Sequence, residues 1–202
     1  MYIPAAFKIK DRAEMIEVIQ TNSFATLFST YEGMPYATHL PLLFNETQDC
    51  LIGHFAKGNP QWKNIEQQDV LAVFQGPHCY ISPSWYETNQ AVPTWNYVAV
   101  HVYGEIELME NEEELVKSFN KMIAKYEGND SPYRLAEVNS KLITNLNNGV
   151  QGFKVKISHM EGKKKLSQNH SMERQQLVIK QLEEIEQSNE QQIAHLMKKN
   201  IK

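Results

Sequence analysis

The sequence predicts a mainly β fold with peripheral helices (α+β), arranged as a closed or split antiparallel barrel. Short runs rich in β-branched and aromatic residues follow one another along the chain, and polar or glycine-containing turns separate them. About six or seven such runs are present, and helical segments are inserted between them without regular alternation. A doubly wound parallel sheet requires that alternation, so the antiparallel arrangement is favoured.

The first part of the chain predicts a helix, three strands and a second, short helix. Asp11 and Glu14 form a capping-box pattern ahead of a partly apolar helix face. Strands are expected over residues 24–30, 36–44 and 51–56. Asn59 followed by Pro60 is typical of a helix start, so a short helix is expected from Pro60 to about Gln67.

The second part predicts further strands and then helices. Strands are expected over residues 70–75, 97–108 and 151–160, with residues 78–82 as an edge strand or a continuation after a bend. Helices are expected over residues 111–126 and 131–147, and one or two exposed helices over residues 171–200. We therefore predict a barrel domain over residues 1–162 and a C-terminal helical segment over residues 163–202.

Composition limits the classes of function. The net charge is −4, and residues 1–160 carry more acidic than basic side chains, which gives little support for binding duplex DNA. A local basic patch at Lys163-Lys164-Lys165 remains open. Cys50 and Cys79 lie in apolar runs and are expected to be buried and reduced, as in a cytoplasmic protein. The longest apolar stretches fall well short of the roughly 20 residues of a membrane-spanning helix.

Motifs of common enzyme classes are missing. Gly53 and Gly58 have the glycine spacing of a phosphate loop, but Asn59-Pro60 follows where Lys-Ser/Thr is required. No G-x-G-x-x-G follows a strand, no histidine pair has metal-ligand spacing, and no nucleophile elbow surrounds a serine. We therefore assign no catalytic residue and no metal ligand from the sequence.

Two stretches combine aromatic and polar residues in a way that suits a planar, charged ligand. Residues 53–63 run from a strand into a helix N-terminus, whose free N–H groups favour a phosphate or the carbonyl edge of a flavin. Residues 78–86 and 92–97 hold Tyr and Trp side chains suited to a heteroaromatic ring. A capped helix with Trp62 packed on the barrel explains the first stretch equally well, and core or interface packing explains the second.

Four short motifs, three of them in these stretches, resemble the PaiB family of protease synthase and sporulation negative regulatory proteins. They are "NPQW" at 59–62, "YISPSWY" at 80–86, "VPTWNY" at 92–97 and "KLSQN" at 165–169. The resemblance extends over nearly the whole chain, in the order of the family. The family is similar to the FMN-binding split barrels, so the resemblance implies a six-stranded antiparallel split barrel, a homodimer and an FMN site at the subunit interface. It also implies negative regulation of the transcription of sporulation and degradative-enzyme genes.

The resemblance implies three groups of FMN-binding residues. The candidates facing the flavin are His54, Lys57, Asn59, Gln61 and Trp62. Those near the ring or the partner subunit are Trp95 and Asn96, and those near the phosphate are Lys165, Ser167, Gln168 and Asn169. His170 departs from the basic residue expected in the family, and histidine would hold a phosphate more weakly and in a pH-dependent way.

Three functions remain open on the sequence. The first is an FMN-binding transcriptional repressor with promoter DNA as a partner. The second is an FMN-dependent oxidoreductase of the flavin reductase class that acts indirectly on regulation. The third is a dimeric interaction module without a cofactor. The expected C-terminal helices carry the basic residues Arg174, Lys180, Lys198 and Lys199 among several glutamates, so they argue only weakly for DNA contact.

Overall fold

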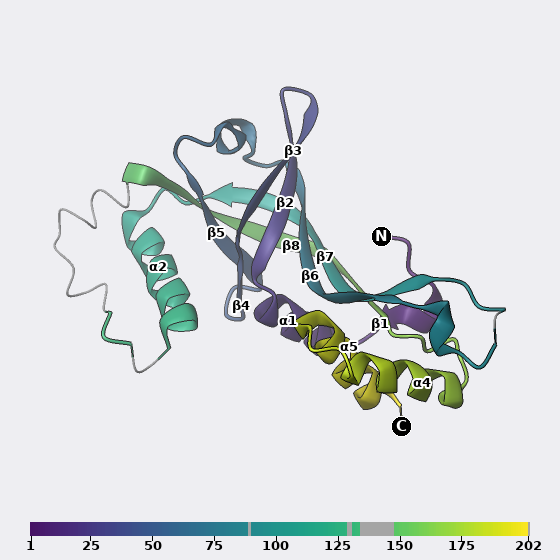
Figure 1. The fold of residues 1–202 in the computed structure, drawn as a ribbon. Coiled ribbons are helices and arrows are strands. Elements are labelled where there is room, and N and C mark those ends of the chain that lie inside the picture. Colours follow the sequence, from purple (N-terminus) through teal and green to yellow (C-terminus); the bar gives the residue numbers. More distant parts are fainter. Residues whose placement is uncertain (89, 129–130, 134–147, 202) are drawn as a thin grey trace. The chain divides into compact units, whose positions relative to one another are not determined.

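The computed structural model describes residues 1–88, 90–128, 131–133 and 148–201. Its strands are β1 (Lys8–Ile9), β2 (Phe24–Tyr31), β3 (Met34–Pro41), β4 (Leu43–Asn45), β5 (Cys50–Ala56), β6 (Asp69–Ile81), β7 (Thr94–Leu108) and β8 (Val150–Lys165). Its α-helices are α1 (Arg12–Thr21), α2 (Glu112–Glu127), α4 (Met172–Glu183) and α5 (Ser188–Asn200) (Figure 1). Three 3₁₀ turns are η1 (Ala5–Phe7), η2 (Pro60–Asn64) and η3 (Pro83–Trp85). The helix expected over residues 131–147 lies almost entirely outside the described residues.

The strands belong to one sheet with the order β3-β2-β6-β7-β8-β5-β4, and β1 pairs with β8. Antiparallel registers include Thr26 opposite Val73 and Gly53 opposite Phe153. This is the predicted class of fold, with a correction in strand number from six to eight. β1 has two residues and β4 has three, which is too short for a period-of-two pattern to stand out. Since only Leu42 separates β3 from β4, the sequence pattern merged them into one strand.

The structure changes the bounds of three other predicted elements. The helix expected from Pro60 to Gln67 is the shorter turn η2, capped as predicted by Asn59, whose Oδ1 accepts from Gln61 N at 3.0 Å. Residues 78–81 continue β6 without a break. β8 continues past residue 160 to Lys165, so the expected strand was five residues short at its end.

The chain divides into two compact units, which are described separately below. The terminal unit comprises residues 1–22, 74–101 and 161–202, and the central unit comprises residues 23–73 and 102–160. β6, β7 and β8 each begin in one unit and end in the other. The predicted division of the chain at residue 162 stays a prediction.

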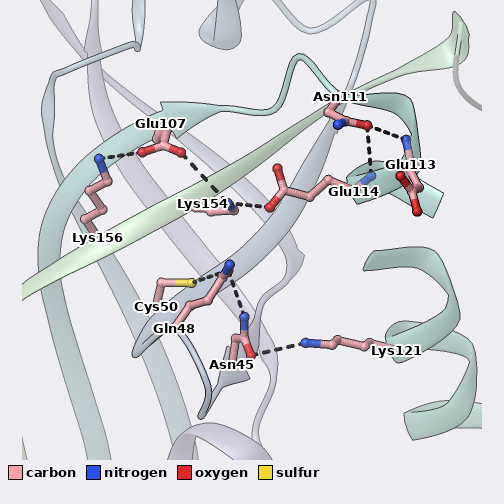
Figure 2. A network of polar contacts seen from close by, with 10 residues as sticks. All are labelled: Asn45, Gln48, Cys50, Glu107, Asn111, Glu113, Glu114, Lys121, Lys154 and Lys156. Carbon is pink, nitrogen blue, oxygen red and sulfur yellow. Dashed lines mark hydrogen bonds and ion pairs between the residues drawn. The ribbon is translucent and has the colours of Figure 1, made fainter. Parts of the chain in front are cut away.

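The central unit has an aromatic core and a capped helix. Phe55 and Phe153 are fully buried and stack with their ring centroids 4.5 Å apart. Asn111 caps α2 as predicted, because its Oδ1 accepts from the backbone N–H groups at the helix start (Figure 2). Lys154 of β8 lies between the carboxylates of Glu107 in β7 and Glu114 in α2 (Figure 2). This ion-pair bridge connects the helix to the sheet.

In the terminal unit, α4 and α5 pack on each other through buried apolar side chains. Val178 and Leu182 are buried, which confirms most of the packing seam predicted for this segment. Ile193 and Met197 supply the matching buried face of α5. The Gln191 side chain donates to the carbonyl oxygens of residues 182, 183 and 185, which are exposed by the end of α4. No helix in the described part of the chain is both long and apolar enough to cross a membrane.

Among the glycines of the central unit, Gly104 lies closest to a neighbouring strand backbone, that of β8. A Cβ at this position would overlap the backbone oxygen of Lys156 and would lie 2.7 Å from Val155 Cγ1. We expect Gly104→Ala to lower the free energy of unfolding by about 1–3 kcal/mol, because neighbouring backbone must shift. The matched control is Gly58→Ala, where nothing lies within 4 Å of the added Cβ. Urea unfolding measures both, and equal stability of the two variants would contradict the packing described.

Candidate functional site

The residues predicted from the sequence fall into two groups, one in each unit. The central unit holds His54, Lys57, Asn59, Gln61 and Trp62. The terminal unit holds Trp95, Asn96, Lys165, Ser167, Gln168 and Asn169. Each group is considered by its own contacts.

Asn59 and Gln61 use their polar atoms inside the central unit. Asn59 Nδ2 donates to Thr38 Oγ1 at 2.8 Å, in addition to its role as helix cap. Gln61 is only 1% exposed, and its Nε2 donates to Ser29 Oγ at 2.9 Å and to Leu27 O at 3.3 Å. Its Oε1 accepts from Thr38 Oγ1. These amides attach η2 to β2 and β3, so their role in this unit is to position the turn.

Lys57 and Trp62 contact each other beside the same turn. Trp62 Nε1 donates to the carbonyl oxygen of Lys57 at 2.9 Å, and Lys57 Nζ lies 4.5 Å from the centroid of the Trp62 ring. Lys57 Nζ also donates to Gln151 Oε1 at 2.5 Å. Lys57 is exposed, and the side chains that it contacts, Gln151 and Trp62, are neutral. Its charge is therefore available for an anionic group.

His54 is half-buried on β5, edge-on to Phe119 at a centroid distance of 5.3 Å. Its buried Nδ1 has no hydrogen-bond partner among the described residues. Burial lowers the pKa of the imidazole, which favours the neutral form. Its surroundings are those of a packed side chain in the interior of the central unit.

In the terminal unit, two lysines of β8 stand out because they lack a carboxylate partner among the described residues. Lys163 is only 7% exposed, and its Nζ donates to Tyr2 O at 3.1 Å and lies 5.0 Å from the Tyr97 ring centroid. Lys165 Nζ donates to Thr94 Oγ1 at 2.5 Å and to Trp95 O at 2.7 Å. Burial, and then the charge of Lys163, lower the pKa of Lys165.

Lys163 and Lys165 share one face of the sheet with a third lysine, Lys8. Lys163 and Lys165 are two residues apart on a strand, so both side chains lie on one face. Lys8 of β1 lies directly opposite Lys163, which places its side chain on that face as well. Partly desolvated like charges are unfavourable without a counter-ion. A bound phosphate would supply the missing negative charge, so these residues fit the phosphate group of a ligand.

An open aromatic surface lies next to the lysine pair. Trp95 is 52% exposed, and its ring contacts Tyr80 edge-on at 6.2 Å and His78 at 6.3 Å between centroids. Because Lys165 donates to the backbone oxygen of Trp95, the cationic and aromatic groups adjoin. A ligand with a planar ring and an attached phosphate matches this combination.

The other predicted residues of this unit shape the turn after β8. Asn96 and Ser167 are buried and bond to each other, with Asn96 Nδ2 donating to Ser167 Oγ at 3.0 Å. Ser167 has φ +63°, a left-handed conformation that favours glycine. Gln168 Oε1 accepts from Leu166 N at 2.6 Å. Asn169 is exposed. The turn therefore sets the position of Lys165.

Lys163 is not among the site residues that the sequence predicts, although it belongs to the basic patch Lys163-Lys164-Lys165. The sequence feature that could have identified Lys163 is the alternation of side chains in a strand that continues through Gly162. A strand ending at residue 160 hides it, whereas β8 as observed places Lys163 and Lys165 on one face.

His170 does not join the lysine pair as a third cation. Its ring lies 5.5 Å from that of Tyr86, and burial, followed by the charges of Arg174 and Lys165, lowers its pKa. Arg174 itself donates from Nε and a terminal nitrogen to Glu87.

Comparison with known proteins gives the class and then the family. The fold is that of flavin proteins: a flavocytochrome from Azotobacter vinelandii matches with a TM-score of 0.62, 16% identity and coverage of 79% of this chain and 69% of that one. An FAD- and heme-binding protein from Mycobacterium smegmatis matches with a TM-score of 0.61, 13% identity and coverage of 78% and 72%. The chain belongs to the family described as "Putative FMN-binding domain", whose model matches residues 1–159.

Among individual proteins, the chain is 44% identical to "Protease synthase and sporulation protein PAI 2" of Bacillus subtilis. The alignment covers 100% of this chain and 99% of that protein. The resemblance to the PaiB family read from the four short motifs is thereby confirmed over the full length.

The burial of His54 predicts a pH dependence of stability. Its folded pKa lies below that of the unfolded chain, so its contribution is complete above the unfolded value of about 6.5 and is lost as the pH falls toward the folded value. The slope from this one group cannot exceed about 1.4 kcal/mol per pH unit. We expect the protein to lose more stability between pH 7.5 and 5.5 than its His54→Phe variant, as measured by urea unfolding. Equal losses would show that His54 does not titrate in this way.

Proposed function

We propose that the protein binds FMN and acts as a negative regulator of sporulation and of degradative-enzyme genes. The observation that carries the FMN proposal is the pair Lys163 and Lys165, which have no carboxylate partner among the residues that the structure describes and lie beside the exposed ring of Trp95. The regulatory proposal rests on the full-length similarity to the Bacillus subtilis protein, whose name refers to protease synthesis and sporulation.

Each group has a distinct role in this proposal. Lys163 and Lys165 hold the phosphate, and Trp95 with Tyr80 lines the flavin ring or the partner subunit. The backbone turn at Ser167 keeps Lys165 in place. FMN, when bound, supplies one- and two-electron redox chemistry, while the protein supplies position and electrostatics.

A homodimer is the proposed assembly, because the central unit exposes an apolar sheet face. Phe24 and Phe28 are 68% and 38% exposed, and they lie on one face of β2 because they are four positions apart in the strand. Large aromatic side chains on an open sheet face suit an interface, and a second copy of this chain would cover them.

The regulator is proposed to work in the cytoplasm. Cys50 and Cys79 are both free and buried, which suits a reducing compartment. Promoter DNA remains its proposed partner, although two of the basic side chains of α4 and α5 are already neutralised. Arg174 pairs with Glu87 and Lys198 pairs with Glu183.

That neutralisation favours a second candidate, an FMN-dependent oxidoreductase that influences regulation indirectly. Contact with duplex DNA depends on unpaired Lys and Arg side chains that can replace counter-ions on the phosphates. Paired cations on the C-terminal helices contribute little to such contact. A flavin enzyme needs no DNA surface, so it is compatible with the charge distribution.

FMN binding is tested by titration followed through quenching of flavin fluorescence. We expect Lys165→Met and Lys163→Met each to weaken FMN binding at least about tenfold, since a charge-assisted contact to phosphate is lost. Riboflavin lacks the phosphate, so its weaker binding should be the same in the protein and in both variants. Lys198→Met, which removes a lysine paired with Glu183, is the control and should bind FMN normally.

Two results would contradict this assignment. One is that neither variant affects FMN binding more than riboflavin binding. The other is that the purified protein retains no FMN, which would leave the third candidate, a dimeric interaction module without cofactor. Light scattering during size-exclusion chromatography of the same samples reports whether a homodimer forms and whether the flavin elutes with it.

The regulatory role is tested by complementation in Bacillus subtilis. A strain without its own PAI 2 protein would express this chain or its Lys165→Met variant, and extracellular protease activity and sporulation frequency would be measured. We expect this chain to restore the values seen with the native protein and the variant to fail if regulation depends on FMN. Failure of both, at equal protein levels, would separate the regulatory proposal from the FMN proposal.

A further inference from the structure

A cavity of about 470 Å³ in the terminal unit lies outside the proposed FMN site. It is lined by residues of α1 and α5 and by Pro77, Val98, Lys164 and Leu166 of the strands and the turn that follows β8. Lys164 lies between Lys163 and Lys165 on β8, so its side chain is on the opposite face of the strand. The cavity therefore opens on the other side of β8 from the lysine pair.

The floor of this cavity is apolar. Pro77, Val98 and Leu166 are buried, and each contributes to the lining. Val18 of α1 and Leu196 of α5 add half-buried apolar surface from the two walls. A volume of this size and an apolar floor with a few polar groups are typical of small-ligand sites.

The two helical walls carry opposite charge. Glu14, Glu17 and Val18 follow one face of α1 at helical spacing, and His195 and Lys199 follow one face of α5. Glu14 forms an ion pair with Lys164 of β8. Glu17 and Lys199 take part in no ion pair or side-chain hydrogen bond with the described residues, which leaves one carboxylate on one wall and one ammonium on the other.

We propose that this cavity binds a short apolar peptide with free ends. Its ammonium end would pair with Glu17, its carboxylate end with Lys199, and its apolar side chains would cover Val98 and Leu166. A single charge on the ligand would match only one wall, whereas a zwitterionic chain matches both. A cavity of about 470 Å³ has the size of sites for ligands larger than a free amino acid, so a dipeptide or tripeptide is the better fit. This inference does not depend on the FMN proposal.

The test uses the peptide Leu-Leu-Leu, its N-acetylated form and its C-terminal amide, with isothermal titration calorimetry. We expect saturable binding of the free peptide, weakened at least about tenfold by either modification. Glu17→Gln should make binding insensitive to N-acetylation, and Lys199→Gln should make it insensitive to amidation. Lys198→Gln is the matched control, because Lys198 lies beside Lys199 but pairs with Glu183 and does not line the cavity.

Three results would overturn the proposal. No saturable binding up to about 1 mM would exclude this class of ligand. Binding that responds to both modifications equally in both variants would place the peptide elsewhere. Binding of the N-acetylated peptide as tightly as the free one would show an apolar anion site instead. Circular dichroism of the exposed-site variants checks that each retains the fold.

Discussion

The structure depends on three long strands that are shared by the two compact units. β6, β7 and β8 have 13, 15 and 16 residues, and each contributes to the core of one unit before it enters the other. Because side chains alternate between the two faces of a strand, the position of a residue in these strands determines which face its side chain lies on. On β8 the same alternation buries Phe153 and Val155 in the central unit and presents Lys163 and Lys165 together in the terminal unit.

Local signals in the sequence predicted much of this fold. The caps at Asp11, Asn59 and Asn111 were found because a cap needs only a side-chain acceptor and the next few backbone N–H groups. The alternation of Val98, Val100 and Val102 identified β7 and its buried face. β1 and β4 escaped because two or three residues carry no period, and because their pairing partners are distant in the chain.

The candidate site was harder to predict, since residue type says little about whether a polar atom is free. Gln61 and Asn96 suit a ligand by composition, yet their amides bond to Ser29 and Ser167, which lie 32 and 71 residues away. The lysine pair shows the reverse case. The three-lysine run does not reveal that Lys163 and Lys165 contact carbonyl oxygens and rings but no carboxylate of the described residues. Those contacts depend on β1, β7 and the N-terminal residues.

The conformation and the hydrogen bond of Ser167, in the turn after β8, place opposite demands on any substitution at this position. A left-handed residue other than glycine costs on the order of 1–2 kcal/mol, so glycine would relax the backbone here. Yet glycine would remove the hydroxyl that bonds to the buried amide of Asn96 and leave that amide without this partner. The two preferences conflict at one position. Protein engineers who seek a more stable version of this chain by inserting glycine at positive φ should therefore pass over Ser167 and choose a position such as Glu32, in the β2–β3 turn.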